Sequence, residues 1–219
     1  MTELSKAVSK ITDLIVSGGQ ALRLVEPKHG FTSVRGIHIA EKTGPLAILN
    51  GRKVLVLVDV ENLNHSAYRL GFKVSYQMLG DRLRNLAKYC TLHAFFSCNQ
   101  GDEGWNQYFI RRGWIPHPND IEIINTYHGI NRLANSDSLI IFTAGMLASR
   151  GNSDLVIIAS GDGQLVCDIA KGLCSLPKER HIATLSLAGS TSRRLDATKN
   201  AHILENIELG QDCLRPIAA

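Results

Sequence analysis

The stretch Val54-Leu-Val-Leu-Val-Asp-Val-Glu-Asn62 decides the fold. Its five aliphatic residues in a row follow the turn-like pair Asn50-Gly51 and predict a strand that is buried on both faces. Such strands are typical of parallel sheets that helices cover on both sides. The run ends abruptly in Asp59, Glu61 and Asn62. Because ligands gather at the carboxyl ends of parallel strands, we expect Asp59 to lie at the mouth of a crevice.

The composition is that of a globular protein. The chain has 219 residues, of which 44% are apolar and 20% are charged, enough for one core with a small appendage. No apolar run approaches the roughly 20 residues that span a bilayer, so we expect no membrane partner. The N-terminus lacks the apolar segment of a secretory signal, and the five cysteines show no CxxC pairing. These features predict a cytoplasmic protein, and the net charge of +4 permits a nucleic-acid partner without requiring one.

Strands and helices alternate through a predicted domain of residues 51–210. We expect helices from Ser75 and from Asp102, a strand over 91–97 between them, and an apolar helix over 138–149 that Asp137 opens. A second buried strand, 155–159, ends in Ser160-Gly161-Asp162, and a helix and a strand over 182–187 follow. This alternation is the signature of a parallel sheet. Residues 117–136 look irregular, and 211–219 look like a tail.

Residues 1–50 form a predicted N-terminal extension. Apolar residues at helical spacing predict an amphipathic helix over 3–17, namely Leu4, Val8, Ile11 and Ile15. Two β-prone pieces, 33–40 and 46–49, suggest a small hairpin. The extension either packs on the core or serves self-association, and a homodimer through it is one expectation.

Acidic residues stand at three positions that a parallel sheet brings to one edge. Two carboxylates about 4 Å apart repel by roughly 4 kcal/mol at an effective dielectric of 20, so a cluster of Asp59, Asp137 and Asp162 must bind protons or a cation. Oxygen ligands without Cys or His favour Mg²⁺ or Mn²⁺. A metal held in this way can activate a water and neutralise charge on a phosphodiester.

The pieces Val58-Asp59-Val60-Glu61-Asn62, then Asp137, then Ser160-Gly161-Asp162 resemble the NYN domain family, the LabA-like or DUF88 group of the PIN-like nucleases, over roughly residues 53–207. The resemblance implies a PIN-like three-layer α/β/α sandwich with a mainly parallel sheet. It also implies a metal-dependent endoribonuclease that uses Mg²⁺ or Mn²⁺ and a metal-activated water on RNA, with DNA as a further substrate to consider. The catalytic metal ligands would be Asp59, Asp137 and Asp162. The resemblance adds Asn62 as a polar residue of the site. With Asn62, the predicted substrate-binding residues are Ser160 of the Ser-Gly-Asp piece and three arginines in segments expected to reach the crevice rim, Arg132, Arg193 and Arg194.

The sequence departs from the family pattern at Gln164 and Thr143, where acids are common. An amide and a hydroxyl bring no charge, so metal affinity should fall. A weakened PIN-like module that binds RNA or a protein partner is therefore the alternative function. Asp59 and Asp137 are also plausible helix caps. A haloacid-dehalogenase-like site would need an Asp where Glu61 stands, and Ser160-Gly161-Asp162-Gly163 lacks the Lys and the spacing of a P-loop.

Overall fold

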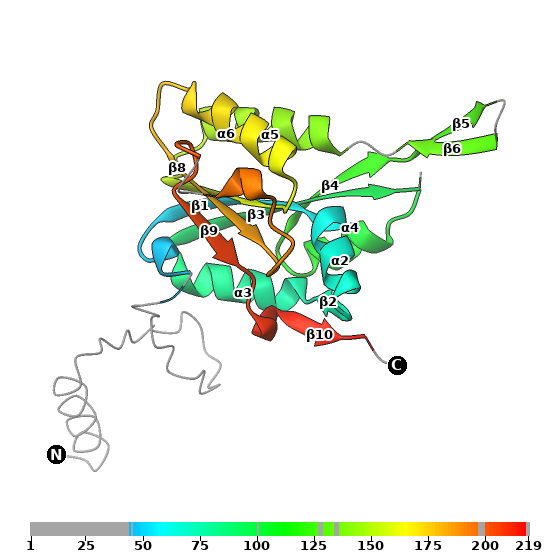
Figure 1. Cartoon of the computed structure of the whole chain (residues 1–219), viewed down its shortest axis with the longest axis horizontal. Helices are drawn as coiled ribbons and strands as arrows, with labels where there is room; N and C mark the ends of the chain where they lie inside the picture. Colours follow the sequence, from blue (N-terminus) through cyan, green and yellow to red (C-terminus); the bar gives the residue numbers. More distant parts are fainter. Residues whose placement is uncertain are drawn as a thin grey trace, which may run out of the picture.

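The fold is a three-layer α/β/α sandwich (Figure 1). The computed structural model describes residues 44, 46–99, 101–126, 129–133, 136–196 and 200–217, with the backbone alone for 122–126 and 129–133. Its central sheet has the strand order β4-β3-β1-β7-β8-β9, and all five pairings are parallel. The strands are β1 (Lys53–Asp59), β3 (Tyr89–Cys98), β4 (Ile115–Asp120), β7 (Leu155–Ala159), β8 (His181–Ser186) and β9 (Glu205–Glu208).

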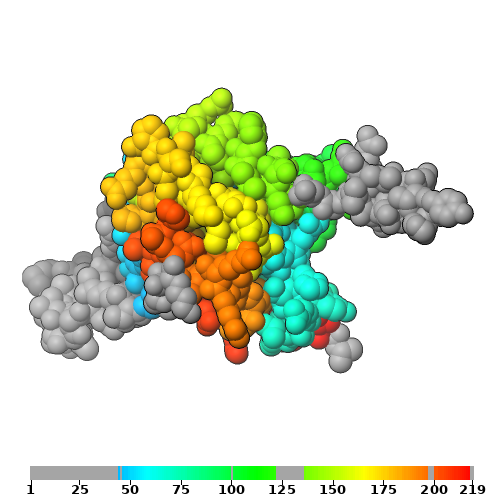
Figure 2. Space-filling model, turned by 45° about the horizontal axis from the view of Figure 1, so that its top comes forward, coloured from blue at the N-terminus to red at the C-terminus, as the bar shows by residue number. Residues whose placement is uncertain are grey.

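Helices cover the two faces of this sheet. One face carries α2 (Val60–Arg69), α3 (Tyr76–Leu86) and α4 (Gly104–Ile110), together with the 3-10 turn η1 (Ala47–Leu49). The other face carries α5 (Asp137–Arg150) and α6 (Gly163–Cys174), which lie side by side, with η2 (Arg193–Leu195) against α6 (Figure 2). Two hydrophobic cores result, one on each face, which confirms the α/β/α prediction. None of the helices in the described ranges combines the length and apolar character that a bilayer crossing requires.

The strand β1 contributes side chains to both hydrophobic cores. Val54, Val56 and Val58 point into the core under α2 and α3, whereas Leu55 and Leu57 point into the core under α5 and α6. Successive side chains of a strand alternate between faces. The next residue of the second set is Asp59, so its carboxyl is directed to the face that carries α5.

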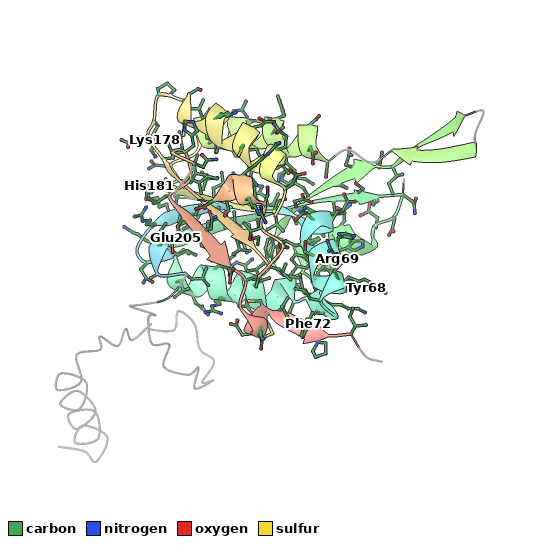
Figure 3. The ribbon with its side chains drawn as sticks, in the orientation of Figure 1. Tyr68, Arg69, Phe72, Lys178, His181 and Glu205 are labelled. Atoms are coloured by element: carbon green, nitrogen blue, oxygen red, sulfur yellow. The ribbon has the colours of Figure 1, made fainter. Side chains whose placement is uncertain are left out.

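All strands of the sheet run in one direction. Figure 3 places His181 and Glu205, the first residues of β8 and β9, on one side of the molecule, and Tyr68 and Arg69 of α2 on the other. The carboxyl ends of the strands therefore share the edge at which α2 begins. The chain adds β3 and β4 on one side of β1 and then returns to add β7, β8 and β9 on the other. The junction of β1 and β7 is the point where the winding reverses, and crevices form there in open α/β sheets.

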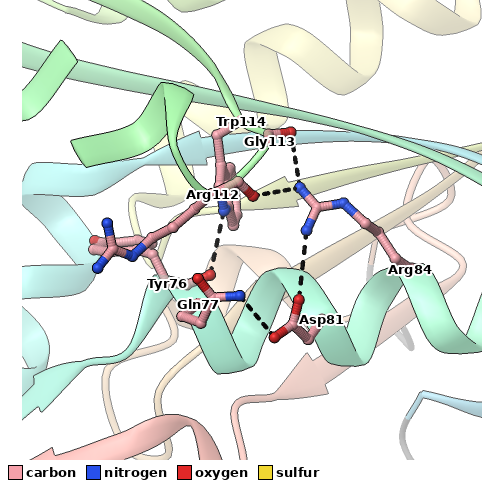
Figure 4. Close-up of polar contacts among 7 residues, drawn as sticks. All are labelled: Tyr76, Gln77, Asp81, Arg84, Arg112, Gly113 and Trp114. Carbon is pink, nitrogen blue, oxygen red and sulfur yellow. Dashed lines mark hydrogen bonds and ion pairs between the residues drawn. The ribbon is translucent and has the colours of Figure 1, made fainter. Parts of the chain in front are cut away.

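A side-chain cluster locks α3 to the end of α4 (Figure 4). The turn after α4 contains Gly113, whose φ of 71° suits a residue without Cβ. The guanidinium of Arg84 donates to the carbonyls of Arg112 (2.9 Å) and Gly113 (2.7 Å) in this turn. Trp114 Nε1 donates to the carbonyl of Tyr76 at 3.2 Å. The start of β4 is thereby fixed against the first face.

Three sequence predictions of local structure were wrong. The described part of 117–136 is largely regular, because β4 continues to Asp120 and the antiparallel strands β5 (Glu122–Thr126) and β6 (Gly129–Leu133) follow. Residues 46–49 form the turn η1 with Leu46 and Leu49 buried, not a strand of a hairpin, while 33–40 and the helix 3–17 lie outside the described residues. The tail contains η3 (Gln211–Cys213) and β10 (Leu214–Pro216), and β10 pairs antiparallel with the short strand β2 (Phe72–Val74).

Candidate functional site

Asp59 ends β1 and begins α2. Its side chain is only 7% exposed, and both of its oxygens accept hydrogen bonds. Oδ1 accepts from the backbone N–H of Asn62 at 3.1 Å, which makes Asp59 the N-cap of α2. Oδ2 accepts from the hydroxyl of Ser160 at 3.1 Å. The capping interpretation and the site interpretation of Asp59 are therefore compatible, because one oxygen caps the helix while the other faces β7.

The register of the sheet brings Ser160 to Asp59. The last pair of β1 and β7 is Val58 with Ala159, so Asp59 and Ser160 continue the same register beyond the ladder. The hydroxyl of Ser160 also accepts from the backbone N–H of Asp162 at 3.1 Å. Asn62 completes the link, because its Oδ1 accepts from the N–H of Gly161 at 2.8 Å. Hydrogen bonds thus tie the two predicted motifs together although they lie about 100 residues apart.

Asp162 sits at the start of α6. Its Oδ1 accepts from the N–H groups of Gln164 (2.7 Å) and Leu165 (3.3 Å), so Asp162 is the N-cap of that helix. The side chain is exposed. The partial positive charge at the helix N-terminus favours a carboxylate at this position.

The loop around Asp162 requires two glycines. A Cβ on Gly161 would come within 2.5 Å of the carbonyl oxygen of Ser190. A Cβ on Gly163 would overlap the hydroxyl of Ser192. The segment at 190–192 therefore packs directly on the turn after β7, and only residues without a side chain permit this approach.

Acidic groups interact electrostatically at this edge. Burial raises the pKa of Asp59 to about 6; the hydrogen bonds from Asn62 and Ser160 oppose the rise, and the charges of Asp137 and Glu61 add to it. Burial also raises the pKa of Asp137, and repulsion from Asp162 and Glu61 contributes. The three predicted acids thus lie at the same edge of the sheet.

Glu61 is a fourth acid that the sequence analysis did not assign to the site. It is exposed, and its Oε1 accepts from the backbone N–H of Ser97 at the end of β3, at 3.1 Å. The signal that identifies it is its place two residues after Asp59. That spacing sets Glu61 in the first turn of α2, facing the neighbouring strand end.

The donor set suits a hard cation only if water completes the coordination. Within the described ranges, no group of three or more His, Cys, Asp or Glu side chains is arranged to hold a metal ion. Both oxygens of Asp59 and one oxygen of Asp162 already accept hydrogen bonds. Mg²⁺ commonly keeps several waters and uses one or two carboxylates together with substrate phosphates. The acids therefore suit an ion that keeps several of its waters better than an ion that protein atoms alone coordinate.

The predicted substrate-binding arginines have different surroundings. Arg194 lies beside the start of α6, where its Nη1 donates to Oε1 of Gln164 at 2.6 Å. The amide of Gln164 donates in turn to Asp168 at 2.8 Å. Arg193 is exposed on the same turn. The side chain of Arg132 lies outside those that the structure describes, so its predicted role stays a prediction.

Gln164, one of the two positions where the sequence departs from the NYN pattern, lies beside an acid of the site. Its backbone N–H binds the carboxylate of Asp162, and its side chain links Arg194 with Asp168. Thr143 is 3% exposed within the buried face of α5. Its hydroxyl adds no charge to the crevice. The acids that act on one another beside β1 are Asp59, Glu61, Asp137 and Asp162.

Comparison with known proteins supports the fold alone. Neither a scan against protein-family models nor a search of curated proteins gave a match. Among solved structures, the chain is similar to a protein of unknown function from Vibrio parahaemolyticus, with 19% sequence identity and a TM-score of 0.56. The similarity covers 76% of this chain and 98% of that chain. At this identity the likeness concerns the arrangement of strands and helices.

Proposed function

We propose that the chain is a metal-dependent endoribonuclease related to the NYN branch of the PIN-like nucleases, with its active site at the junction of β1 and β7. The observation that carries the proposal is the hydrogen-bonded pair of Asp59 and Ser160 at the point where the winding of the sheet reverses. A buried carboxyl with further acids beside it is costly to ionise. A divalent cation would stabilise the ionised carboxylates, so binding such an ion would explain why the acids lie together.

The residues of the crevice have separable roles in this proposal. A bound Mg²⁺ or Mn²⁺ would supply a nucleophilic water and offset charge on the phosphodiester, and Asp59, Asp137 and Asp162 would hold it. Ser160 and Asn62 hold the carboxyl of Asp59 in one orientation by donating to its two oxygens. Above a pH of about 6 this carboxyl is ionised and able to attract a cation.

Arginines beside α6 provide the positive charge that an RNA backbone requires. Arg193 and Arg194 occupy the turn η2, which packs against α6. Arg194 contacts the residue two positions after Asp162, so a phosphate on this turn would lie next to the acids. Phosphate contacts of this kind position a nucleic acid without reading its sequence. RNA is therefore the proposed substrate class, and DNA of the same sequence is the comparison.

A second candidate function is a PIN-like module that binds RNA or a protein partner without cleaving RNA. Gln164 favours it, because this amide engages Arg194 and Asp168 where the family often places an acid. The hydrogen bonds that both oxygens of Asp59 already accept favour it as well.

The test is cleavage of labelled RNA by the full-length protein with Mn²⁺, Mg²⁺ or EDTA, beside DNA of the same sequence. Asp59→Asn removes the buried charge and keeps the shape of the side chain. The matched control is Asp154→Asn, because Asp154 likewise accepts a backbone N–H, from Lys53, but lies at the amino end of β7. Loss of several kcal/mol of charge stabilisation predicts a fall in rate of about 100-fold or more for Asp59→Asn alone.

The outcomes separate the two candidates. Cleavage that needs a divalent ion, disappears in Asp59→Asn and persists in Asp154→Asn supports the nuclease. Cleavage that survives Asp59→Asn rejects this active site. Retained RNA binding without cleavage by the wild-type protein selects the binding module. Absence of both rejects the nuclease and an RNA-binding module.

We also propose a cytoplasmic setting. All five cysteines are free thiols, which suits a reducing compartment. The predicted homodimer through residues 1–50 is checked by light scattering on the full-length chain, where a monomeric mass would exclude it.

A further inference from the structure

A groove lies over the amino ends of β1, β3 and β4, at the edge of the sheet opposite the acids. Its volume is about 720 Å³, within the range of pockets that bury small ligands. Leu55 on its floor points to the face of the sheet that carries α5, and Lys53 shares this face because side chains alternate along a strand. Leu147, in the last turn of α5, lines one side. The groove is therefore bounded by α5 and by the sheet face on which α5 packs.

One end of the groove is apolar and uncharged. Its floor is formed by Ile115 of β4 and by His93, with which Ile115 pairs on β3. Burial lowers the pKa of His93 to about 4, and the charge of His117 contributes, so the imidazole of His93 is neutral at pH 7. The side chain of Ile115 is 47% exposed. This end can therefore bind the apolar body of a ligand, whereas a charged group placed here would lose its hydration without compensation.

The other end of the groove offers hydrogen-bond donors. Among the described residues of the lining, the ionised side chains are those of Lys53 and Lys88, and both are positive. Asn152 also lines this end, and its Oδ1 accepts from Nζ of Lys178 at 2.6 Å, so its amide N–H groups are what it offers to a ligand. Figure 3 shows Lys178 on the same side of the molecule as His181, the first residue of β8. Donors of this kind bind an anionic group.

A buried hydroxyl at the same end has no hydrogen-bond partner among the described residues. Ser153 lines the groove and is 9% exposed, and its Oγ is the unpartnered atom. The following residue, Asp154, donates its N–H to the carbonyl of Lys53 at 2.8 Å, so Ser153 lies near Lys53. The carboxylate of Asp154 accepts from the backbone N–H of Lys53 and is not part of the lining. Because buried polar groups are normally paired, the hydroxyl of Ser153 marks a place where a ligand oxygen would complete the hydrogen bonding.

We propose that this groove binds a fatty acid, with the carboxylate at the end that carries Lys53 and the hydrocarbon chain along the floor towards Ile115. The donors at one end select an anionic head, and the neutral end selects an apolar tail. Ile115 pairs with the residue four positions after the partner of Lys53, one strand further on. The two residues are therefore about 16 Å apart at ordinary strand spacings, close to the length of extended dodecanoate. The groove and the acids lie at opposite edges of the sheet, so this proposal does not rest on the proposed nuclease.

Calorimetric titration of the full-length protein with dodecanoate, at pH 8 and below the micelle concentration, tests the assignment. We expect saturable binding of one molecule per chain. Decanoate lacks two methylene groups and should bind about 15-fold more weakly. Dodecyltrimethylammonium, which has the same tail and a positive head, should bind more weakly than dodecanoate by about tenfold or more. Equal binding of the two heads, or no saturable binding of dodecanoate, overturns the proposal.

Three variants locate the bound molecule. Lys53→Gln removes a charge from the polar end and should weaken dodecanoate about tenfold, whereas Lys73→Gln, exposed on β2 and outside the groove, is the matched control and should keep full affinity. Thr91→Trp fills the floor with an indole and should abolish binding. Ser153→Ala removes a hydroxyl without a described partner, so it should leave the Tm of the free protein unchanged and reduce the rise in Tm that dodecanoate causes.

The variants also separate the groove from other places on the surface. Full affinity for dodecanoate in both Lys53→Gln and Thr91→Trp would place the molecule elsewhere and overturn the proposal. Hydrogen exchange of the wild-type protein addresses a second copy of the chain as the occupant. Amides near Tyr89 that become protected as the protein concentration rises, and that dodecanoate leaves unaffected, would assign the groove to that copy and overturn fatty-acid binding.

Discussion

The substitution Asp59→Asn should increase the stability of the protein at alkaline pH. The pKa of this carboxyl rises from 3.8 to about 6 on folding, chiefly because the group is buried. Each unit of pKa corresponds to about 1.4 kcal/mol, so ionising Asp59 in the folded protein costs about 3 kcal/mol. A raised pKa in an acid stabilises the fold below pH 3.8, and that contribution is lost as the pH rises through 6. The amide of Asn carries no charge and escapes this loss.

The assay is urea denaturation of the wild-type protein and Asp59→Asn between pH 4 and pH 8, with EDTA present. Asn can keep both contacts, because its oxygen accepts from the N–H of Asn62 and its amide donates to Ser160 Oγ, whose hydroxyl rotates. The free energies of unfolding of the two proteins should lie closest together at pH 4. The variant should become more stable relative to the wild type by about 3 kcal/mol at pH 8.

Added Mn²⁺ should reverse the ranking at pH 8, because an ion that binds only the folded wild-type protein stabilises it by mass action. Asp154→Asn serves as the control for loss of a carboxylate elsewhere in the sheet. If the difference in free energy of unfolding between Asp59→Asn and the wild type stays constant from pH 4 to pH 8, the reasoning is refuted. The pKa of Asp59 would then not be raised in the folded protein.

Three further changes address the surroundings of Asp59 and Asp162. Ser160→Ala removes the hydrogen bond that lowers the pKa of Asp59, so the pH midpoint of RNA cleavage should move above 6; a midpoint at or below 6 in a pH–rate profile would contradict the role of this hydroxyl. Gly163→Ala places a methyl group against Ser192 and should destabilise the fold by about 1–3 kcal/mol in urea, whereas Gly172→Ala meets open space inside α6 and should stabilise it by about 0.5–1 kcal/mol. Gln164→Asp adds a carboxylate next to Asp162 and should tighten Mn²⁺ binding in calorimetry; unchanged affinity would show that this position does not reach the ion.

The fold could be predicted from the sequence mainly because of its buried strands. β7 and the stretch of β1 from Val54 to Val58 are apolar runs, and such runs are typical of a parallel sheet covered on both faces. The placement of Asp59 and Asp162 at one edge followed from that geometry. The hairpin of β5 and β6 was missed because its alternation is weak and polar residues interrupt it. β2 was missed because it is three residues long and its partner β10 lies at the far end of the chain.

The contacts within the site depend on registers that a single sequence does not display. Ser160 meets Asp59 only because Val58 pairs with Ala159. The involvement of Glu61 depends on which way the first turn of α2 faces. The close approach of 190–192 to Gly161 and Gly163 depends on a loop that returns from β8. Each of these is a tertiary contact between segments, and the local sequence pattern of neither segment predicts the contact.

The position of β1 between β3 and β7 has a consequence for biosynthesis. β1 meets β3 after 36 further residues, but it meets β7 only after 101. A growing polypeptide on the ribosome can therefore pair β1 with β3 well before β7 has been translated, and at that stage the carboxyl of Asp59 lies at an open flank, hydrated and normally acidic. The pKa of Asp59 rises only when the second half of the chain has folded against β1 and buried the carboxyl. We expect nascent fragments that end before residue 155 to lack the chemistry of the finished molecule.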